Sequence, residues 1–211
     1  MAEPLRVMIS GSTMRIVMDD DTVRNARPTP TQTWIVINDS STGPVDPQPG
    51  NGQFKVPFAF STVEAVGEYG PRFGRFHEGI DFPGAGVGGA GTPIKVSGNG
   101  VVQENYEHPA FGNLLIVNHG IITTGSLAGK RVRSLYAHMI APSPLAVGSA
   151  TVAGVTVAGG VGNTGSASQG AHLHHEIHIT DPNNGIVWNT SDNGGYRSAM
   201  SPRTFYGEYG G

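Results

Sequence analysis

The chain of 211 residues contains no cysteine. A disulfide framework and a zinc site with thiolate ligands are therefore excluded, and a bound metal would have to use imidazole and carboxylate groups. Charged residues are also few, at 14%, and the formal net charge is -3. Because a protein that neutralises phosphates needs a basic surface, this balance argues against nucleic acid as a partner.

Long apolar runs are missing as well. No segment approaches the roughly 20 apolar residues that span a bilayer, so we expect no membrane-spanning helix and no membrane partner. The N-terminal sequence MAEPLRVMISGSTMRIVMDDD lacks the basic start and continuous apolar stretch of a secretory signal. We therefore expect no signal peptide in this chain.

Glycine and proline are abundant, with 32 and 15 residues, and hydrophobic residues make up 37% of the chain. No stretch sustains the three- and four-residue apolar spacing of a helix, whereas short β-leaning runs alternate with glycine-rich turns. These patterns predict a mostly β protein with one main antiparallel sheet core and no long helices.

Changes in composition divide the chain into four predicted regions. Residues 1–38 are predicted to be a small β-rich docking region, and residues 39–53, which are rich in proline and turn formers, a linker. Residues 54–189 contain recurring strand-like runs and form the predicted main domain. Residues 190–211 are polar and glycine-rich with little periodicity, which predicts a tail that wraps the surface or binds a partner.

Histidines give the most informative pattern. His77 stands four residues before Asp81 in HEGID, and His172 and His174 stand two residues apart in AHLHHE. In a strand, these last two imidazoles would point to the same face and could approach one metal ion. Each motif alone often occurs by chance, but the chain also carries His138 in the segment LYAHM. Two histidines and one aspartate match the three ligands of a hydrolytic zinc site.

Five segments occur in a characteristic order within residues 65–180: EYGPRFGRFHEGIDFPG, GTPIKVSGNGVV, FGNLLIVNHG, LYAHM and GNTGSASQGAHLHHEIH. In these segments the chain resembles the lysostaphin/LytM-type zinc endopeptidases, whose shared core is called the duplicated hybrid motif. The resemblance implies that His77, Asp81 and His174 bind one Zn²⁺ ion per chain. It also implies catalytic roles for His138 and His172 and leaves their acid and base roles unassigned.

The resemblance further implies a zinc-dependent endopeptidase that cleaves cross-bridge or stem peptides of bacterial peptidoglycan. The alternative is a noncatalytic scaffold that uses the same fold to bind the wall or a partner. A wall-directed enzyme without a signal peptide is also expected as a component of a phage tail, with tail proteins as partners of both terminal regions. The expected location is thus the virion or the extracellular cell wall.

The sequence predicts other roles for the remaining histidines. Strand parity places His175 on the face opposite the ligands, where a core or interface role is expected. His178 shares the ligand face but is expected outside the first coordination shell, and His119 is expected to be a turn residue with a satisfied side chain. Three further residues are candidates for the cleft, with turn or core roles as the alternative: Tyr69, His108 and Asn113.

Overall fold

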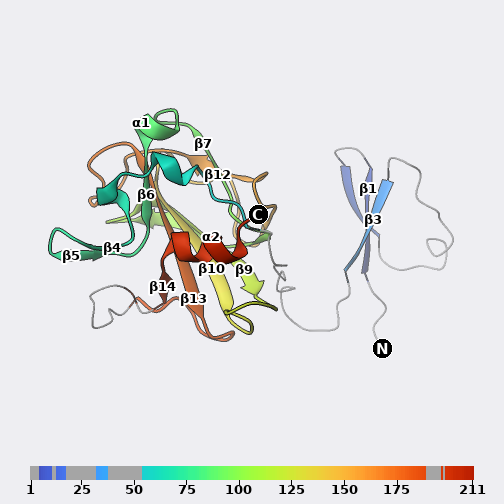
Figure 1. Cartoon of the computed structure of the whole chain (residues 1–211). Helices are drawn as coiled ribbons and strands as arrows, with labels where there is room; N and C mark the ends of the chain where they lie inside the picture. Colours follow the sequence, from blue (N-terminus) through green and yellow to red (C-terminus); the bar gives the residue numbers. More distant parts are fainter. Residues whose placement is uncertain (1–4, 11–12, 18–31, 38–53, 189–195, 197) are drawn as a thin grey trace. The chain divides into compact units, whose positions relative to one another are not determined.

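The computed structural model describes residues 5–10, 13–17, 32–37, 54–188, 196 and 198–211 (Figure 1). The chain divides into two compact units, residues 1–45 and residues 46–211.

The first unit contains one antiparallel sheet of three strands in the order β2-β1-β3. The strands are β1 (Leu5–Ser10), β2 (Thr13–Val17) and β3 (Gln32–Ile37). The sheet lies within the β-rich region predicted for residues 1–38. The predicted linker, residues 39–53, lies outside the described residues, and the docking role of the first unit stays a prediction.

The second unit is built on a larger sheet in the order β11-β8-β9-β10-β13-β14, with β6 also paired to β13. All neighbouring strands in it run antiparallel. Its strands are β6 (Ile80–Pro83), β8 (Gly100–His108), β9 (Gly112–Ile121), β10 (Arg131–Met139), β11 (Ala150–Thr151), β13 (His172–Thr180) and β14 (Ala199–Met200).

Smaller elements surround this sheet. Two strand pairs are formed by β4 (Gly70–Arg72) with β5 (Arg75–His77), and by β7 (Pro93–Lys95) with β12 (Val157–Gly160). The helical elements are short: η1 (Phe60–Thr62), η2 (Ala65–Gly67), α1 (Gly84–Val87) and α2 (Pro202–Tyr209). The predicted mostly β, antiparallel fold is confirmed, and the described residues form no long helix. None of the helices in the described ranges is long and apolar enough to span a membrane.

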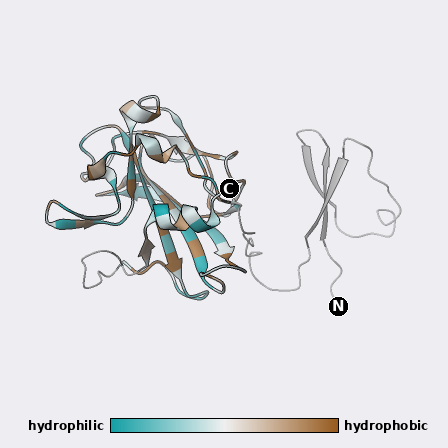
Figure 2. Cartoon of the chain, viewed as in Figure 1, coloured by the Kyte–Doolittle hydropathy of each residue, from teal (hydrophilic) through white to brown (hydrophobic). Residues whose placement is uncertain are grey.

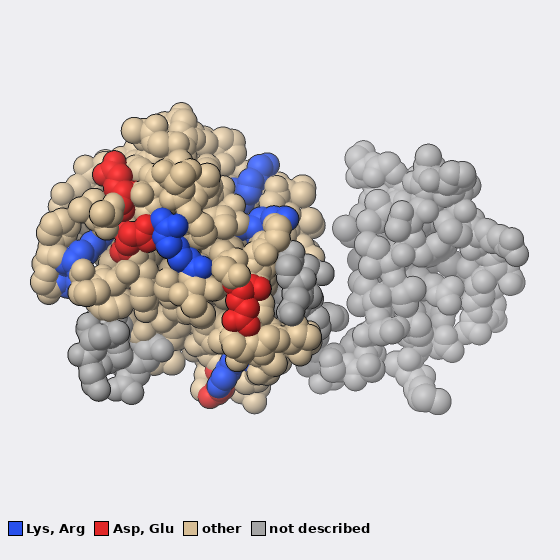
Figure 3. All heavy atoms as spheres, in the orientation of Figure 1, with Lys and Arg blue, Asp and Glu red and all other residues tan. Residues whose placement is uncertain are grey.

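The main core lies on one face of the large sheet, where apolar residues from several strands meet. It includes Phe82 of β6, Leu115 of β9, Tyr136 of β10 and Leu173 of β13, all fully buried. Apolar and polar residues alternate along much of β13, as expected where successive side chains point to opposite faces, whereas residues 114–117 of β9 are apolar and buried on both faces. Figure 2 shows the hydropathy of the second unit. Charged side chains are sparse on the face of this unit seen in Figure 3.

The tail predicted for residues 190–211 is described only at residues 196 and 198–211, which include helix α2. Ser201 caps α2 by accepting a hydrogen bond from the Thr204 N–H, and proline occupies the first helical position. Along one side of the helix, Phe205 and Tyr209 are buried against Phe54 in a second core cluster. The helix is therefore part of the core of the second unit, and this face of it is closed to other chains.

Candidate metal centre

The strand pairing brings distant residues of the sequence together at one point. Because β6 pairs antiparallel with β13, Asp81 lies directly opposite His174. His77 ends β5, and Gly79 stands between it and Asp81. A Cβ atom at Gly79 would lie 2.5 Å from the His175 carbonyl oxygen and 2.9 Å from His174 Cε1. Only glycine allows this close approach of the backbone to β13.

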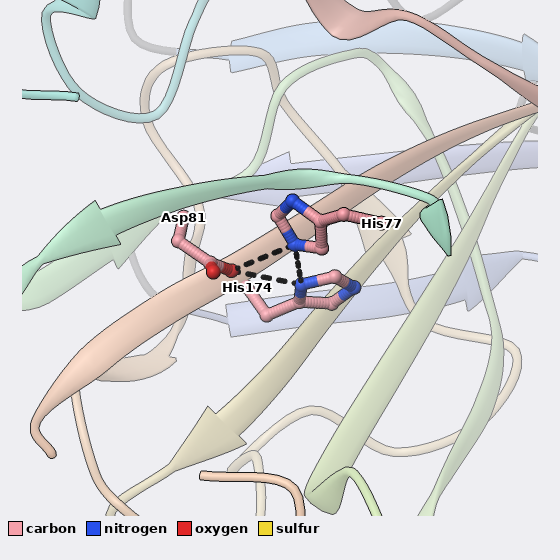
Figure 4. A group of neighbouring side chains, drawn as sticks. All are labelled: His77, Asp81 and His174. Atoms are coloured by element: carbon pink, nitrogen blue, oxygen red, sulfur yellow. Dashed lines mark hydrogen bonds and ion pairs between the residues drawn. The ribbon is translucent and has the colours of Figure 1, made fainter. Parts of the chain in front are cut away.

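The three predicted metal ligands meet in the structure (Figure 4). Asp81 Oδ1 lies 3.1 Å from His77 Nε2 and 2.9 Å from His174 Nδ1, and the two ring nitrogens are 3.0 Å apart. His77 and His174 are buried, and Asp81 is half-buried. Two imidazole nitrogens and one carboxylate oxygen thus converge from three different strands.

Each imidazole is held in one orientation by its other nitrogen. His77 Nδ1–H donates to the Glu68 carbonyl over 2.8 Å, and His174 Nε2–H donates to Glu176 Oε1 over 2.7 Å. These bonds leave His77 Nε2 and His174 Nδ1 free to face a metal ion, which is the usual arrangement around metal-binding histidines. Glu176 Oε2 in turn accepts from His178 Nε2–H over 2.5 Å.

Arg72 holds the remaining oxygen of the aspartate. Its Nη1 lies 2.8 Å from Asp81 Oδ2 and also donates to the Val66 carbonyl. The two carboxylate oxygens therefore have separate partners, since Oδ2 binds the guanidinium while Oδ1 faces the two imidazoles.

The electrostatics of the cluster favour a cation. Burial disfavours the charged ring of His174, but the hydrogen bonds to the Asp81 and Glu176 carboxylates outweigh it and raise the pKa of His174 to about 10. Burial likewise opposes the charge on Asp81, yet the bonds to His174 and His77 hold its pKa well below the usual range. Two ionised carboxylates around one ring attract positive charge, and the donor set fits zinc.

His138 and His172 lie beside this cluster, with ring centroids 4.6 Å apart. His138 Nδ1–H donates to the Thr164 carbonyl and His172 Nδ1–H to the Gly170 carbonyl, each over 2.7 Å. The Nε2 atom of each ring is left as an acceptor, and His172 Nε2 lies 3.7 Å from Asp81 Oδ1. Both predicted catalytic histidines therefore lie beside the predicted metal ligands.

The backbone at His138 is unusual. The register between β10 and β9 shifts between Tyr136 and Met139, and His138 has a φ of 59°, which few residues other than glycine adopt. Burial lowers the pKa of His138 to about 4, and the charge of His174 adds to the effect. The irregularity thus aims a neutral imidazole at the site.

All five residues line one cleft of about 1800 Å³. Its other walls include Arg72 and Phe73 of the β4–β5 hairpin and Phe111, whose ring stacks on His174 with centroids 5.6 Å apart. The cleft is large enough for several residues of an extended peptide, and the convergent polar groups lie along its lining.

The other histidines are placed by the structure in different environments. His175 is buried in the core, as expected, and His119 is a buried residue near the end of β9 with both ring nitrogens hydrogen-bonded. His178 lies behind Glu176, outside the ligand set, and His108 lines the cleft.

The two remaining candidates have structural partners, because Asn113 donates to the Met139 carbonyl and the Tyr69 hydroxyl donates to the Ala199 carbonyl. The sequence analysis missed two residues at the centre, Arg72 and Glu176. Strand parity could have indicated Glu176, since it shares the face of His172 and His174.

Comparisons with known proteins identify the family of this chain. The model of Peptidase family M23 matches residues 75–196. The chain is 33% identical over 105 residues to the DD-carboxypeptidase/endopeptidase Mpg of Neisseria gonorrhoeae, covering 50% of this chain and 20% of that protein. The chain thus spans about a fifth of the length of the curated relatives it matches.

Two solved structures share the fold. The catalytic domain of the prophage-encoded M23 protein EnpA from Enterococcus faecalis is 25% identical, with 73% of this chain and 98% of that chain covered and a TM-score of 0.50. The antimicrobial peptidase lysostaphin from Staphylococcus simulans is 24% identical, with 76% and 58% covered and a TM-score of 0.50. Because the family model covers more than half of the chain, the chain belongs to Peptidase family M23, the lysostaphin/LytM-type metallopeptidases.

Proposed function

We propose that this chain is a zinc-dependent endopeptidase that hydrolyses peptide bonds in bacterial peptidoglycan. The observation that carries the proposal is the convergence of His77, Asp81 and His174 in a cleft that also holds two further oriented imidazoles. Family membership supports peptidase chemistry, and the resemblance to lysostaphin/LytM-type enzymes supports the wall substrate. A zinc ion, when bound, supplies a Lewis acid that polarises a carbonyl and acidifies water at the open coordination position.

The two other histidines provide proton transfer. His138 Nε2 is a free acceptor on a ring that stays neutral near pH 7, because burial lowers its pKa to about 4. Its Nε2 lone pair, which faces the site, would take a proton from the attacking water and pass it to the leaving amine. His172 lies across from His138, and its Nε2 faces the site because Nδ1–H is bound to the Gly170 carbonyl. When Nε2 also carries a proton, it would donate to the developing oxyanion.

The test is release of new amino groups from purified sacculi, with mass spectrometry of the fragments. Zinc-loaded protein, chelator-treated protein and His138→Asn are compared. Asparagine tolerates the positive φ of His138, so this variant removes the imidazole without forcing the backbone to change. We expect release that depends on metal and falls by about 10²- to 10⁴-fold in His138→Asn.

A matched control is Val155→Asn, an exposed residue outside the cleft lining, which should release fragments like the parent chain. Absence of release from sacculi of several cross-link types, by a chain with bound zinc, would contradict the enzyme and favour the noncatalytic scaffold. The fragment masses identify the bond that is cut.

We also propose that the second unit is carried on a phage tail through residues 1–38. The similarity to a prophage-encoded M23 protein and the division of the chain into two units support this proposal. Attachment to tail particles should be lost in a fragment of residues 54–211, which keeps α2 because that helix belongs to the core. Equal attachment of this fragment and the full chain would contradict the proposal.

A further inference from the structure

The turn of the β4–β5 hairpin places a bulky aromatic residue where turn chemistry disfavours it. Arg72 pairs with Arg75, so the connection is the two residues Phe73 and Gly74, with φ of 47° and 74°. Two-residue turns with positive φ at both positions favour Asn-Gly, and a bulky side chain in this region is strained. Phe73 is also 84% exposed, the highest value among the large hydrophobic residues that the structure describes. Neither local conformation nor core packing accounts for this side chain.

The hairpin is fixed to the metal centre. Gly70 pairs with His77 at its base, and Arg72 near its tip binds the Asp81 carboxylate. Figure 1 shows the hairpin at the edge of the second unit, and Phe73 lines the same cleft as the metal ligands. The exposed ring is therefore held at a defined place on the cleft wall.

Arg75 shares the site-facing side of the hairpin. Alternation along β5 places it on the same face as His77, and Phe76, which also borders the cleft, packs against Tyr69 with ring centroids 5.0 Å apart. Arg72 is neutralised by Asp81, but no carboxylate of the described residues lies within ion-pair distance of Arg75, which lines the cleft. Figure 3 shows basic side chains where the hairpin lies.

We propose that the β4–β5 turn selects the substrate, with Phe73 packing on an aliphatic side chain of the bound peptide and Arg75 binding its free carboxylate. The preferred substrate is then an acidic peptide with aliphatic side chains, such as a stem peptide, rather than a neutral glycine bridge. This inference rests on the proposed function and assigns the substrate class of the same cleft. Guanidinium and carboxylate form charge-assisted hydrogen bonds, which give more discrimination than neutral contacts.

The test for Arg75 compares one synthetic stem-type peptide in free-acid and amidated form. The parent chain should prefer the free acid by about tenfold in kcat/KM, mainly through KM, and Arg75→Gln should remove this preference. Arg75→Lys should keep part of it, because the charge remains. The control is Lys130→Gln, which changes an exposed ion pair with Asp181 outside the cleft lining.

The test for Phe73 uses Phe73→Asn, which has opposite effects on the turn and on the substrate. Asparagine suits the turn, so thermal stability should stay equal or rise, while KM for the stem-type peptide should increase by about tenfold. Zinc content should not change. If Phe73 had only a structural role, Phe73→Asn would lower the thermal stability and leave KM unchanged. Val155→Asn is the control for loss of an exposed apolar side chain.

Binding of both peptides to the zinc-loaded chain is measured by calorimetry beside cleavage. If the free acid binds more tightly and Arg75→Gln abolishes the difference, the assignment holds even where no bond is cut, and only the proposed hydrolysis fails. If Arg75→Gln weakens both peptides equally, or Phe73→Asn leaves affinity and KM unchanged, the assignment of the turn is overturned.

Discussion

The two faces of β13 hold adjacent histidines in opposite electrostatic states. His174 and His175 are both buried, and for both rings burial opposes the charged form. On the site face, the Asp81 and Glu176 carboxylates outweigh burial and raise the pKa of His174 to about 10. On the core face, burial prevails and lowers the pKa of His175 to about 3. Carboxylate partners, rather than burial, decide which buried histidine attracts a cation.

The partners on the core face are neutral. His175 Nδ1–H donates to the Leu135 carbonyl, and its Nε2 accepts from the Tyr206 hydroxyl over 2.8 Å. Hydrogen bonds continue from this ring through buried hydroxyls to a second buried histidine. The chain of groups runs through Tyr206, His175, Ser97, Tyr136, Ser134 and His119 to the Asn99 carbonyl. Such a satisfied network stabilises the core without a site for a metal ion.

The strongest test of this difference removes one ligand. His174→Ala should reduce zinc affinity, because one of the three predicted donors is gone. The loss should exceed the roughly 10- to 100-fold that follows removal of a residue that only hydrogen-bonds to a ligand. Activity on sacculi should disappear with the metal. Zinc content is measured after dialysis against buffer of known free zinc, and equal content in the variant and the parent chain would show that His174 is not a ligand.

A smaller effect is expected from a variant that removes the charge of the Glu176 side chain and keeps its shape. Glu176→Gln keeps an acceptor for His174 Nε2–H but removes the negative charge, so zinc affinity should fall by roughly 10- to 100-fold. Competition with a chromophoric chelator measures the affinity. Unchanged affinity, in a chain that is folded by circular dichroism, would mean that Glu176 only fills space behind the ligand.

The matching change on the core face should act on stability instead. His175→Phe leaves the Leu135 carbonyl and the Tyr206 hydroxyl without this partner, which should reduce the free energy of unfolding by about 1–3 kcal/mol. Zinc affinity of the folded variant should match that of the parent chain. Urea denaturation in chelator gives the first quantity, and a loss of zinc affinity similar to that of Glu176→Gln would remove the distinction between the faces.

Sequence reasoning predicted the faces of β13 better than it predicted their partners. Strand parity separates His174 from His175 because the period of two is a local property of the chain. Arg72 reaches Asp81 only because of the register of the β4–β5 hairpin. The periodicity of the sequence does not indicate this register.

Helix α2 shows the same limit. Its eight residues include Pro202 and Gly207, and its burial depends on contact with Phe54, about 150 positions earlier in the chain. Family resemblance supplied the predicted metal ligands, whereas tertiary contacts such as these had to come from the structure.

The pH dependence of stability offers the finest test. Burial lowers the pKa of His119 to about 4 and that of His175 to about 3, from the ordinary 6.5. Between pH 6.5 and 4 the unfolded chain binds protons at these rings and the folded chain does not, so the stability that these two neutral rings contribute is full above pH 6.5 and falls as the pH decreases. Each ring should contribute a slope of up to about 1.4 kcal/mol per pH unit. In urea titrations at pH 7 and pH 5 with chelator, His175→Phe should show a shallower slope than the parent chain. Equal slopes would mean that His175 takes up a proton in the folded state, and the two faces of β13 would then differ less than their partners imply.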